Sequence, residues 1–397
     1  MAEGEPTTLD EFTAGTTTES VARTLRLKLE TSNQKNSRIR DAVDDWQTVA
    51  KIIAAYLPSF PPYRWSGRDT QLTRVAAREA PDDLNLYAHD RNAAAYKAQE
   101  AFNSWNERGR DGERPIGEFG NSDYLRICSC CTKPSRRVEI VENERGYGLR
   151  AKIVPREDPL WFHIDCGEYQ REYLERLVAG DLSYGALEFR LNDGDLFAHL
   201  SIEEEVEVYR PEDVSTRIGV DLGETTLYAA AVVDDEEIVE VEMESGAEFR
   251  HHRERLDRRR TELMEAGDLR GVRAIRGERE RYTNHVTNTA TREIVRLAER
   301  HTPAVIHLEN LTDYRETATD PIHDWPYARL QEQISYKATE RGIPVRFVDP
   351  AGTSTTCRKC GQRTPEARTG DTFHCRRCDY EVHADVNGAI NIALRAE

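Results

Sequence analysis

Four cysteines in two close pairs constrain the fold of this chain more than any other feature. They form the pattern Cys357-x2-Cys360-x14-Cys375-x2-Cys378. Each pair is typical of a tight turn that directs two thiolates at one metal ion, and two such turns complete a tetrahedral zinc site. Because all four ligand positions are sulfur, the site has no open position for chemistry. The pattern therefore predicts a structural zinc ion, with free cytoplasmic thiols as the alternative.

The residues that follow the two pairs fit such turns unequally. Gly361 follows the first pair and can adopt a positive φ without steric cost. Asp379 stands in the corresponding place after the second pair, and Asp adopts that conformation less readily than Gly. We expect both turns to form.

A second group of potential metal ligands lies near the middle of the chain. The segment "CSCC" contains Cys128, Cys130 and Cys131, and "HIDC" contains His163 and Cys166. Their spacing offers C-x-x-C and H-x-x-C pairs, but "LWFHIDC" also has the pattern of a buried strand in which His163 is the polar member. The sequence leaves a second zinc site and a plain strand as alternatives.

The chain is acidic, with a formal net charge of −17 over 397 residues, and only 8 of its 55 basic residues are Lys. Abundant acid with little Lys indicates a host with a salt-rich cytoplasm, an ordinary acidic protein being the alternative. Overall acidity normally disfavours nucleic acid as a partner. High salt weakens that inference because it screens long-range repulsion, so the local distribution of arginine decides.

No apolar run approaches the length needed to span a membrane. The first 20 residues, "MAEGEPTTLDEFTAGTTTES", are acidic and lack the basic flank and apolar stretch of a signal peptide. We expect residues 1–20 to be a disordered acidic tail and the protein to be cytoplasmic.

The remaining pattern divides into a strand-and-helix half and an α/β half. Residues 23–29 alternate as a strand, and helical spacing follows at 32–57 and 84–109. Residues 124–209 are mostly short strands with one helical insert, which suits a small barrel. From residue 217, three strands, one long Arg-rich helical region (residues 248–300), a strand, a helix and a strand predict an α/β layer.

Three carboxylates stand where strands end or a helix begins. Asp221 lies in "IGVDLGETT", Glu309 in "VIHLENL", and Asp385 opens the final helix, where an N-cap is the ordinary role of Asp. Ligands of open α/β sheets gather beyond the carboxyl ends of strands, so Asp221 and Glu309 should meet there and the closing helix can bring Asp385 alongside. Three close carboxylates need compensating cations, and Mg²⁺ suits their oxygen ligands. Two such ions would clamp a scissile phosphate.

The order of these motifs resembles that of the OrfB (TnpB) proteins of insertion sequences, which are RNA-guided DNA endonucleases related to type V CRISPR effectors. The resemblance rests on "GVDLG", "IHLENL", "WPYARLQEQISYKATERGIPVRFVDPAGTSTTCRKCG" and "FHCRRCDYEVHADVNGAINIA". It is close over residues 214–395 and loose before them. Two departures are Asp379, where Gly is usual, and Gly388, where the family often has Ala.

This resemblance implies a RuvC nuclease domain with an RNase H-like α/β fold and an inserted zinc ribbon. It also implies an N-terminal β-barrel (wedge) domain that carries a helical recognition insert. Asp221, Glu309 and Asp385 take the catalytic and Mg²⁺-binding roles. The expected segments are the wedge at 21–32 and 117–213, the recognition domain at 33–116, RuvC at 214–352 and 381–397, and the ribbon at 353–380.

The implied partners are a guide RNA from the end of the element and target double-stranded DNA, with no membrane. Sequence would be read by base pairing while the protein holds the heteroduplex by shape and charge. Together with the acidic composition, the resemblance predicts a halophilic archaeon as host.

The stretch Arg250–Arg281 carries 11 Arg and seven acidic residues, a local excess of positive charge in an acidic chain. It predicts contact with a nucleic-acid backbone, the alternative being a solvated helix with i,i+4 ion pairs. The candidate contacts are Arg253, Arg258, Arg259, Arg260, Arg329 and Lys337.

Two other functions fit parts of the sequence. A nuclease-inactive RNA-guided DNA-binding protein would keep the same domains, although all three acids stand here. An actin-type or sugar-kinase ATPase would explain "VDLGETT" as a phosphate loop. An ATPase would leave the four cysteines unexplained. The sequence after residue 221 also lacks the second phosphate turn that such enzymes need.

Overall fold

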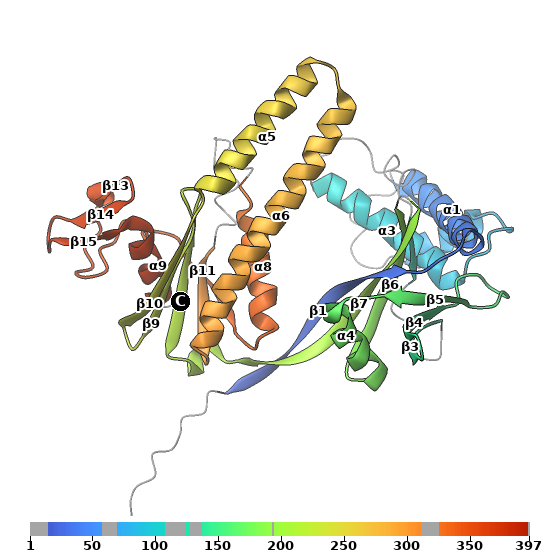
Figure 1. The fold of residues 1–397 in the computed structure, drawn as a ribbon, viewed down its shortest axis with the longest axis horizontal. Coiled ribbons are helices and arrows are strands. Elements are labelled where there is room, and N and C mark those ends of the chain that lie inside the picture. Colours follow the sequence, from blue (N-terminus) through green and yellow to red (C-terminus); the bar gives the residue numbers. More distant parts are fainter. Residues whose placement is uncertain are drawn as a thin grey trace, which may run out of the picture. The chain divides into compact units, whose positions relative to one another are not determined.

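The structure is a computed structural model that describes residues 15–57, 70–107, 124–127, 137–192, 194–310 and 325–395 (Figure 1). It divides into two compact units, one comprising Ala22–Glu204 and the other Glu205–Glu397 together with Met1–Val21. The candidate ligands Cys128, Cys130 and Cys131 lie outside the described residues, as do residues 1–14 of the expected tail.

In its described residues, the unit Ala22–Glu204 combines four helices with a seven-stranded sheet whose order is β2-β6-β7-β1-β5-β4-β3. Apolar residues of the helices and strands share one core, in which Trp46, Phe189 and Leu25 are almost fully buried. Ser32 caps the first helix by accepting a hydrogen bond from the Lys35 backbone. The elements are β1 (Thr16–Leu29), α1 (Asn33–Tyr56), α2 (Thr70–Glu79), α3 (Ala88–Glu107), β2 (Tyr124–Ile127), β3 (Val138–Asn143), β4 (Gly146–Ala151), β5 (Leu160–Asp165), α4 (Glu168–Ala179), β6 (Ser183–Asn192) and β7 (Asp195–Tyr209).

Two expectations for this half need comment. Strand β1 begins at Thr16, so the prediction of a disordered tail through residue 20 is wrong for its last residues, which are exposed but lie in a strand. The sheet order places β2 and β3 at its two ends, and among the described strands no pairing joins them. Closure of these strands into a barrel therefore stays a prediction.

The second unit contains a five-stranded sheet of order β10-β9-β8-β11-β12, covered by helices on both faces (Figure 1). Strand β9 is antiparallel to β8 and β10, whereas β11 is parallel to β8 and β12. This matches the α/β layer predicted from the sequence. The elements are β8 (Thr216–Leu222), β9 (Thr226–Asp234), β10 (Glu237–Ser245), α5 (Ala247–Glu265), α6 (Leu269–Arg300), β11 (Ala304–Glu309), α8 (Tyr327–Thr339), β12 (Val345–Val348) and α9 (Ala384–Leu394).

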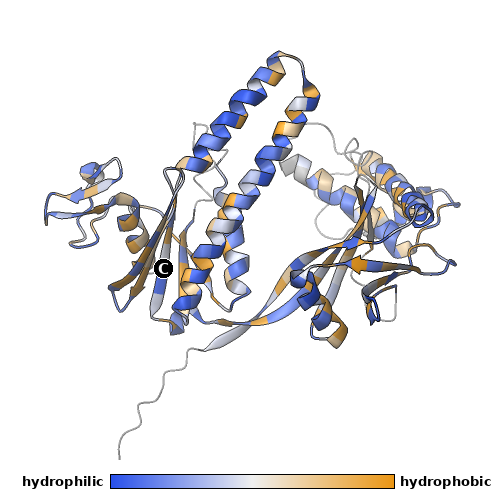
Figure 2. Ribbon diagram, viewed as in Figure 1, coloured by the Kyte–Doolittle hydropathy of each residue, from blue (hydrophilic) through white to orange (hydrophobic). Residues whose placement is uncertain are grey.

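The two faces of this sheet are buried by different helices because side chains alternate along each strand. Ile218, Val220 and Leu308 pack against apolar residues of α6 and α8. On the other face, Ala229 and Ala231 pack against the apolar side of α9. Figure 2 shows that α9, which packs on this face, is largely hydrophobic, whereas α5 is almost entirely hydrophilic. The sheet is therefore a middle layer between two helical layers.

The long Arg-rich helical region is two helices rather than one. Helix α5 ends at Glu265 and α6 begins at Leu269, and the turn contains Gly267 with a φ of 71°. The side chain of Asp268 accepts a hydrogen bond from the Gly271 backbone and so caps α6. The result is a helical hairpin (Figure 1).

A small three-stranded sheet separates β12 from α9 along the chain. It consists of β13 (Arg368–Thr369), β14 (Thr372–Cys375) and β15 (Tyr380–His383), all antiparallel. Its core contains Cys357, Phe373 and Cys375, so the cysteines supply part of its burial. None of the described helices is long and apolar enough to span a membrane.

Candidate active site

Asp221 and Glu309 lie on neighbouring strands at the same edge of the sheet. Strands β8 and β11 are parallel, and Val220 pairs with Leu308 in their register. Asp221 follows Val220 and Glu309 follows Leu308, so the two acids lie next to each other at the carboxyl edge of the sheet. The structure thus brings together the two strand acids that the sequence predicted to meet.

Both acids point to the face of the sheet that α9 covers. Gly219 and His307 pair with each other on this face, and the His307 ring lies 3.2 Å from the carbonyl oxygen of Ile392 on α9. Because side chains two residues apart share a face, Asp221 and Glu309 share it as well. Burial lowers the pKa of His307, which favours a neutral ring inside this layer.

Two glycines allow the close approach of β8 and α9. A Cβ atom at Gly219 would lie 2.0 Å from the carbonyl oxygen of Ala389, which no side chain could tolerate. A Cβ atom at Gly388 would lie 2.5 Å from Oδ2 of Asp221. The carboxylate of Asp221 therefore rests directly against the first turns of α9.

Asp385 lies in the first turn of α9, one turn before Gly388. The N-cap is His383, whose ring accepts a hydrogen bond from the Asp385 backbone, so the N-cap role considered for Asp385 is wrong. The Asp385 residue is only 8% exposed, and its Oδ1 lies 2.8 Å from the guanidinium of Arg368 on β13. Its carboxylate is thus available to a cation rather than committed to the helix terminus.

Glu309 and Asp385 act electrostatically on Asp221. Burial, followed by the negative charges of Glu309 and Asp385, raises the pKa of Asp221 well above its ordinary value, and Arg368 opposes this rise. Such a group of carboxylates favours bound cations. Among the described residues, however, only the four cysteines place every potential ligand atom within 4.8 Å of the others. The acids lie side by side but are not drawn that close together.

Glu309 is held by two neighbours from different elements. The hydroxyl of Thr353 donates to Oε1 of Glu309 at 2.5 Å, and Gln331 of α8 donates to the Glu309 carbonyl oxygen at 2.7 Å. Burial raises the pKa of Glu309, while the hydrogen bond from Thr353 lowers it. Thr353 therefore stabilises the ionised form of this acid.

The segment that enters the cysteine sheet is tied to α9. Asn391 donates to the carbonyl oxygens of Thr353 and Thr356, each at 2.7 Å, and Asn387 donates to that of Thr356 at 2.8 Å. Thr353, Arg368 and both asparagines were not predicted from the sequence. The polar residues of "DVNGAIN" at helical spacing, within an otherwise apolar helix, were a usable signal for the asparagines. Nothing in the sequence pairs Thr353 with Glu309.

The four cysteines predicted to bind zinc lie together. The sulfur atoms of Cys357 and Cys378 are 3.6 Å apart, as are those of Cys360 and Cys375. Four sulfur atoms around one ion at about 2.3 Å would be roughly 3.8 Å apart, so the spacing suits a tetrahedral site. Backbone N–H groups, chiefly that of Cys378, lower the pKa of Cys375 to about 6, which favours its thiolate, whereas burial raises the pKa of Cys357 and of Cys378.

Both predicted turns after the cysteine pairs form. Gly361 has a φ of 68° and Asp379 a φ of 55°. The Asp379 backbone donates to the carbonyl oxygen of Cys375 at 2.8 Å, and its carboxylate lies 2.9 Å from the His374 ring. These contacts explain how Asp serves at a position that favours Gly.

The second group of potential ligands is only partly described. His163 lies within strand β5 and pairs with Gly148, as the strand alternative predicted, and Cys166 packs at the edge of the core. Cys128 and Cys131 lie outside the described residues. A second zinc site stays a prediction.

The six residues predicted to contact nucleic acid have different surroundings. Arg258, Arg259 and Arg260 are exposed on α5. Arg253 is 9% exposed, with its guanidinium 5.5 Å from the ring centroids of Phe249 and Trp325.

The two candidates on α8 are engaged with α6. Arg329 contacts Asn284 at 2.7 Å and Glu280 at 2.8 Å. Lys337 donates to Thr291 at 2.6 Å, and burial lowers its pKa to about 8. Lys337 is therefore less available to a ligand than the arginines of α5.

Comparison with known proteins places this architecture in a family. The model of the "Cas12f1-like, TNB domain" matches residues 327–392, which run from α8 through the cysteine sheet to α9. The CRISPR-associated endodeoxyribonuclease Cas12f1 of Sulfoacidibacillus thermotolerans is 30% identical over 302 residues, covering 70% of this chain and 66% of that protein. A TnpB-like protein of Aquifex aeolicus (strain VF5) is 36% identical over 73 residues, 18% of this chain and 24% of that protein.

A solved structure supports the fold along nearly the whole chain. The cryo-EM structure of a Cas12f1–sgRNA–target DNA complex matches with a TM-score of 0.60 and 15% identity, covering 94% of this chain and 99% of that chain. This chain spans just under two thirds of the length of the Sulfoacidibacillus protein. These two relatives are named as an endodeoxyribonuclease and a TnpB-like protein. The chain is a TnpB-like relative of the type V CRISPR effectors, the group to which the Cas12f proteins belong.

Proposed function

We propose that this protein is an RNA-guided, Mg²⁺-dependent DNA endonuclease encoded by an insertion sequence. The observation that carries the proposal is the gathering of Asp221, Glu309 and Asp385 at one edge of the α/β sheet, from two strands and the closing helix. The relatives named above are endodeoxyribonucleases or TnpB-like proteins, and the solved neighbour is a complex with a guide RNA and target DNA.

In this proposal the three acids hold divalent cations. The raised pKa of Asp221, caused by burial and by the other two carboxylates, fits a site that favours added positive charge. Oxygen ligands of this kind suit Mg²⁺. Two bound ions would supply an activated water and stabilise the leaving oxygen during hydrolysis of the phosphodiester.

The side chains around the acids have positioning roles in this scheme. Thr353 keeps Glu309 ionised and oriented, and Gln331 fixes the strand end that carries it. Arg368 neutralises Asp385 and is a cation already directed at the site. The four cysteines would hold a structural Zn²⁺ that keeps Arg368 and the Thr353 segment in place.

The two compact units would have separate roles. We assign the RNase H-like RuvC domain to residues 214–352 and 381–397, with the zinc ribbon inserted at 353–380. The other unit, Ala22–Glu204, would provide most of the wedge domain, at 21–32 and 117–213, and the helical recognition domain, at 33–116; residues 21 and 205–213 of the wedge belong to the unit that carries the acids. Guide RNA and target double-stranded DNA are the partners, in the cytoplasm, and no membrane is involved.

Purified protein with its copurifying RNA provides the direct test. The RNA is sequenced, and a plasmid library carrying its complement beside randomised flanks is incubated with the complex in Mg²⁺. We expect cleavage by the wild-type complex and none by Asp221→Ala, Glu309→Ala or Asp385→Ala, while RNA binding is retained. Cutting by all three variants would overturn the assignment of the acids.

The same assay separates the nuclease from its inactive alternative. A wild-type complex that binds the matched target but leaves it intact in Mg²⁺ and Mn²⁺ would indicate an RNA-guided DNA-binding protein. A complex that holds no RNA would contradict both.

A further inference from the structure

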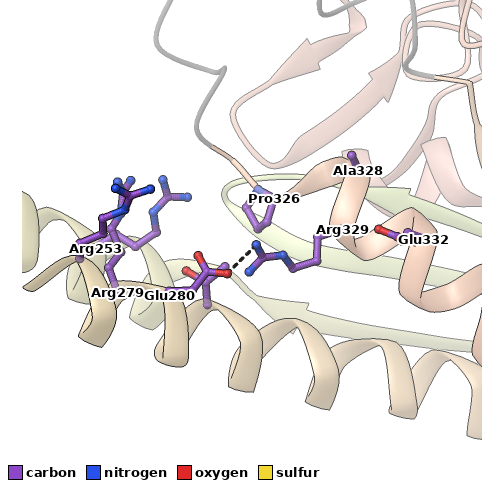
Figure 3. Close-up of a pocket in the computed structure, with 9 residues that line it drawn as sticks. Arg253, Arg279, Glu280, Pro326, Ala328, Arg329 and Glu332 are labelled. Atoms are coloured by element: carbon purple, nitrogen blue, oxygen red, sulfur yellow. Dashed lines mark ion pairs between the residues drawn. The ribbon is translucent and has the colours of Figure 1, made fainter. Parts of the chain in front are cut away.

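A pocket of about 380 Å³ lies between the helical hairpin and the beginning of α8. It is on the side of the sheet that α6 and α8 cover. Figure 3 shows Arg253 and Arg279 directed into it from the hairpin, with Arg329 across from them and Pro326 and Ala328 at the start of α8. Its charged lining residues are Arg253, Arg276, Arg279, Arg329, Glu280 and Glu332.

The charge of this pocket is opposite to that of the chain. Among the described lining residues, four arginines against two glutamates leave a formal charge of +2, whereas the whole chain carries −17. Guanidinium groups match phosphate oxygens in geometry as well as in charge. Among the described residues that line the pocket none is aromatic, so that part of the lining offers no stacking surface for a base. An anion, rather than a base or an apolar group, is the ligand that suits it.

Three of the four arginines are held before any ligand arrives, whereas Arg276 is exposed. Arg253 is fixed against the Phe249 and Trp325 rings, at 5.5 Å from each centroid. Arg329 is fixed by Glu280 and Asn284, and Arg279 lies 3.7 Å from Asp257 of α5. Side chains that are already ordered lose little conformational freedom on binding, which favours affinity.

The pocket lies near the edge of the sheet that carries the acids. Gln331, one turn into α8, donates to the carbonyl oxygen of Glu309, and its neighbours Ala328, Arg329 and Glu332 line the pocket. At about 1.5 Å per residue, α6 from Arg279 to Arg300 is roughly 32 Å long, whereas the six residues of β11 span about 20 Å. Since β11 begins shortly after α6 ends, Arg279 lies beyond the carboxyl edge of the sheet.

We infer that this pocket is a binding site for one backbone phosphodiester of the DNA strand that enters the acid site. A phosphodiester carries a single negative charge, in keeping with the modest excess of positive charge. The contact would fix the path of the strand without reading its sequence. This inference rests on the proposed function and adds to it a second, non-catalytic point at which the DNA is held.

The test compares two double variants of α6 with the same change in charge. Arg276→Gln with Arg279→Gln removes two lining residues. Arg292→Gln with Arg296→Gln removes two exposed arginines of the same helix outside the pocket. Binding of single-stranded target DNA to the RNA-loaded protein is measured in EDTA, without cleavage, between 0.1 and 1 M KCl. The affinity for guide RNA is measured in parallel, and melting curves check that each variant is folded.

We expect the pocket variant to flatten the plot of log affinity against log salt by about 0.7, the value for one phosphate on a single strand. The control variant should leave the slope at the wild-type value, and neither should alter binding of guide RNA. Equal slopes for the two variants, or a loss confined to RNA binding, would contradict phosphodiester binding by this pocket. If the pocket variant is unfolded, Arg276→Gln alone, at an exposed position, gives the same comparison.

The outcomes separate this inference from the function on which it rests. If the wild-type complex cuts its target and the pocket variant keeps the wild-type salt slope, only phosphodiester binding by the pocket is contradicted. If the wild-type protein does not bind target DNA that matches its guide RNA, both the proposed function and phosphodiester binding by the pocket are contradicted.

Discussion

Two side chains from outside the strands and helix that carry the acids hold the carboxylates of the candidate site. Thr353, only 3% exposed, donates to Glu309, and Arg368 contacts Asp385. Both come from the segment between β12 and α9, which also carries the cysteines. The geometry of the acids therefore depends on residues that have no part in the chemistry themselves.

Replacing Thr353 by Val should weaken metal binding at the acids. Val has nearly the same shape but cannot donate, and hydrogen bonds to charged groups contribute about 1.5–3 kcal/mol. We expect the Mg²⁺ concentration for half-maximal cleavage to rise about tenfold or more, and direct Mn²⁺ binding followed by electron paramagnetic resonance to weaken in parallel.

Two variants define the specificity of that result. Thr353→Ser keeps the hydroxyl and should restore most of the metal affinity. Thr355→Val changes the same segment at a hydroxyl that, among the described residues, donates to the Gly352 carbonyl oxygen at 3.4 Å, and should behave as wild type. Equal behaviour of Thr353→Val and Thr355→Val would count against the positioning role.

Asp221 should cost the metal-free protein stability at neutral pH. Its pKa is raised in the folded state, so its contribution to stability is present below about pH 4, its ordinary pKa, and is lost as pH rises through the folded value. We expect Asp221→Asn to abolish cleavage but to melt at a higher temperature than wild type at pH 7 in EDTA. The difference should shrink toward pH 4; a lower melting temperature for the variant at pH 7 would refute this.

At the scale of elements, the acids were predictable because their strands are. The mostly apolar, buried runs of β8 and β11 end at Asp221 and Glu309, and parallel strands present their carboxyl ends at one edge. The long-range contacts of Thr353 and Arg368 with the acids were not predictable, because no local sequence pattern specifies which carboxylate a hydroxyl or guanidinium contacts. The break between α5 and α6 was also missed, since Arg-rich helical spacing continues on both sides of Gly267.

The cysteine sheet should control activity without contacting DNA or Mg²⁺ at the acids. Changing Cys375 and Cys378 to Ser removes two of the four sulfur ligands, which should release zinc and loosen both Arg368 and the Thr353 segment. We expect loss of bound zinc by elemental analysis and a large fall in the cleavage rate, with guide RNA still bound. Full activity of a zinc-free variant would contradict this coupling.

At the scale of the whole molecule, the charge is unevenly distributed. The net charge is −17, yet the hairpin presents the exposed residues Arg258, Arg259 and Arg260. A protein that binds polyanions can be this acidic if salt screens the repulsion between its surface and the ligand. The halophilic archaeal host inferred from this composition stays a prediction.

Salt should stabilise the protein, because screening reduces repulsion among the surplus acids. We expect the melting temperature to rise between 0.1 and 1 M KCl, with sucrose at matched osmolality giving a smaller rise. A melting temperature that falls with KCl would argue for an ordinary acidic protein and a low-salt host.

The contact between Gly219 and α9 bears on how mutational scans of this protein would read. Gly219 has no chemistry, but any side chain there would meet the backbone of α9 at 2.0 Å and push away the helix that carries Asp385. A library selected for cleavage should therefore reject every substitution at Gly219 as firmly as at the acids. Intolerance alone would not distinguish the residues that cut DNA from the one that lets them assemble; only the loss of folding at Gly219 would.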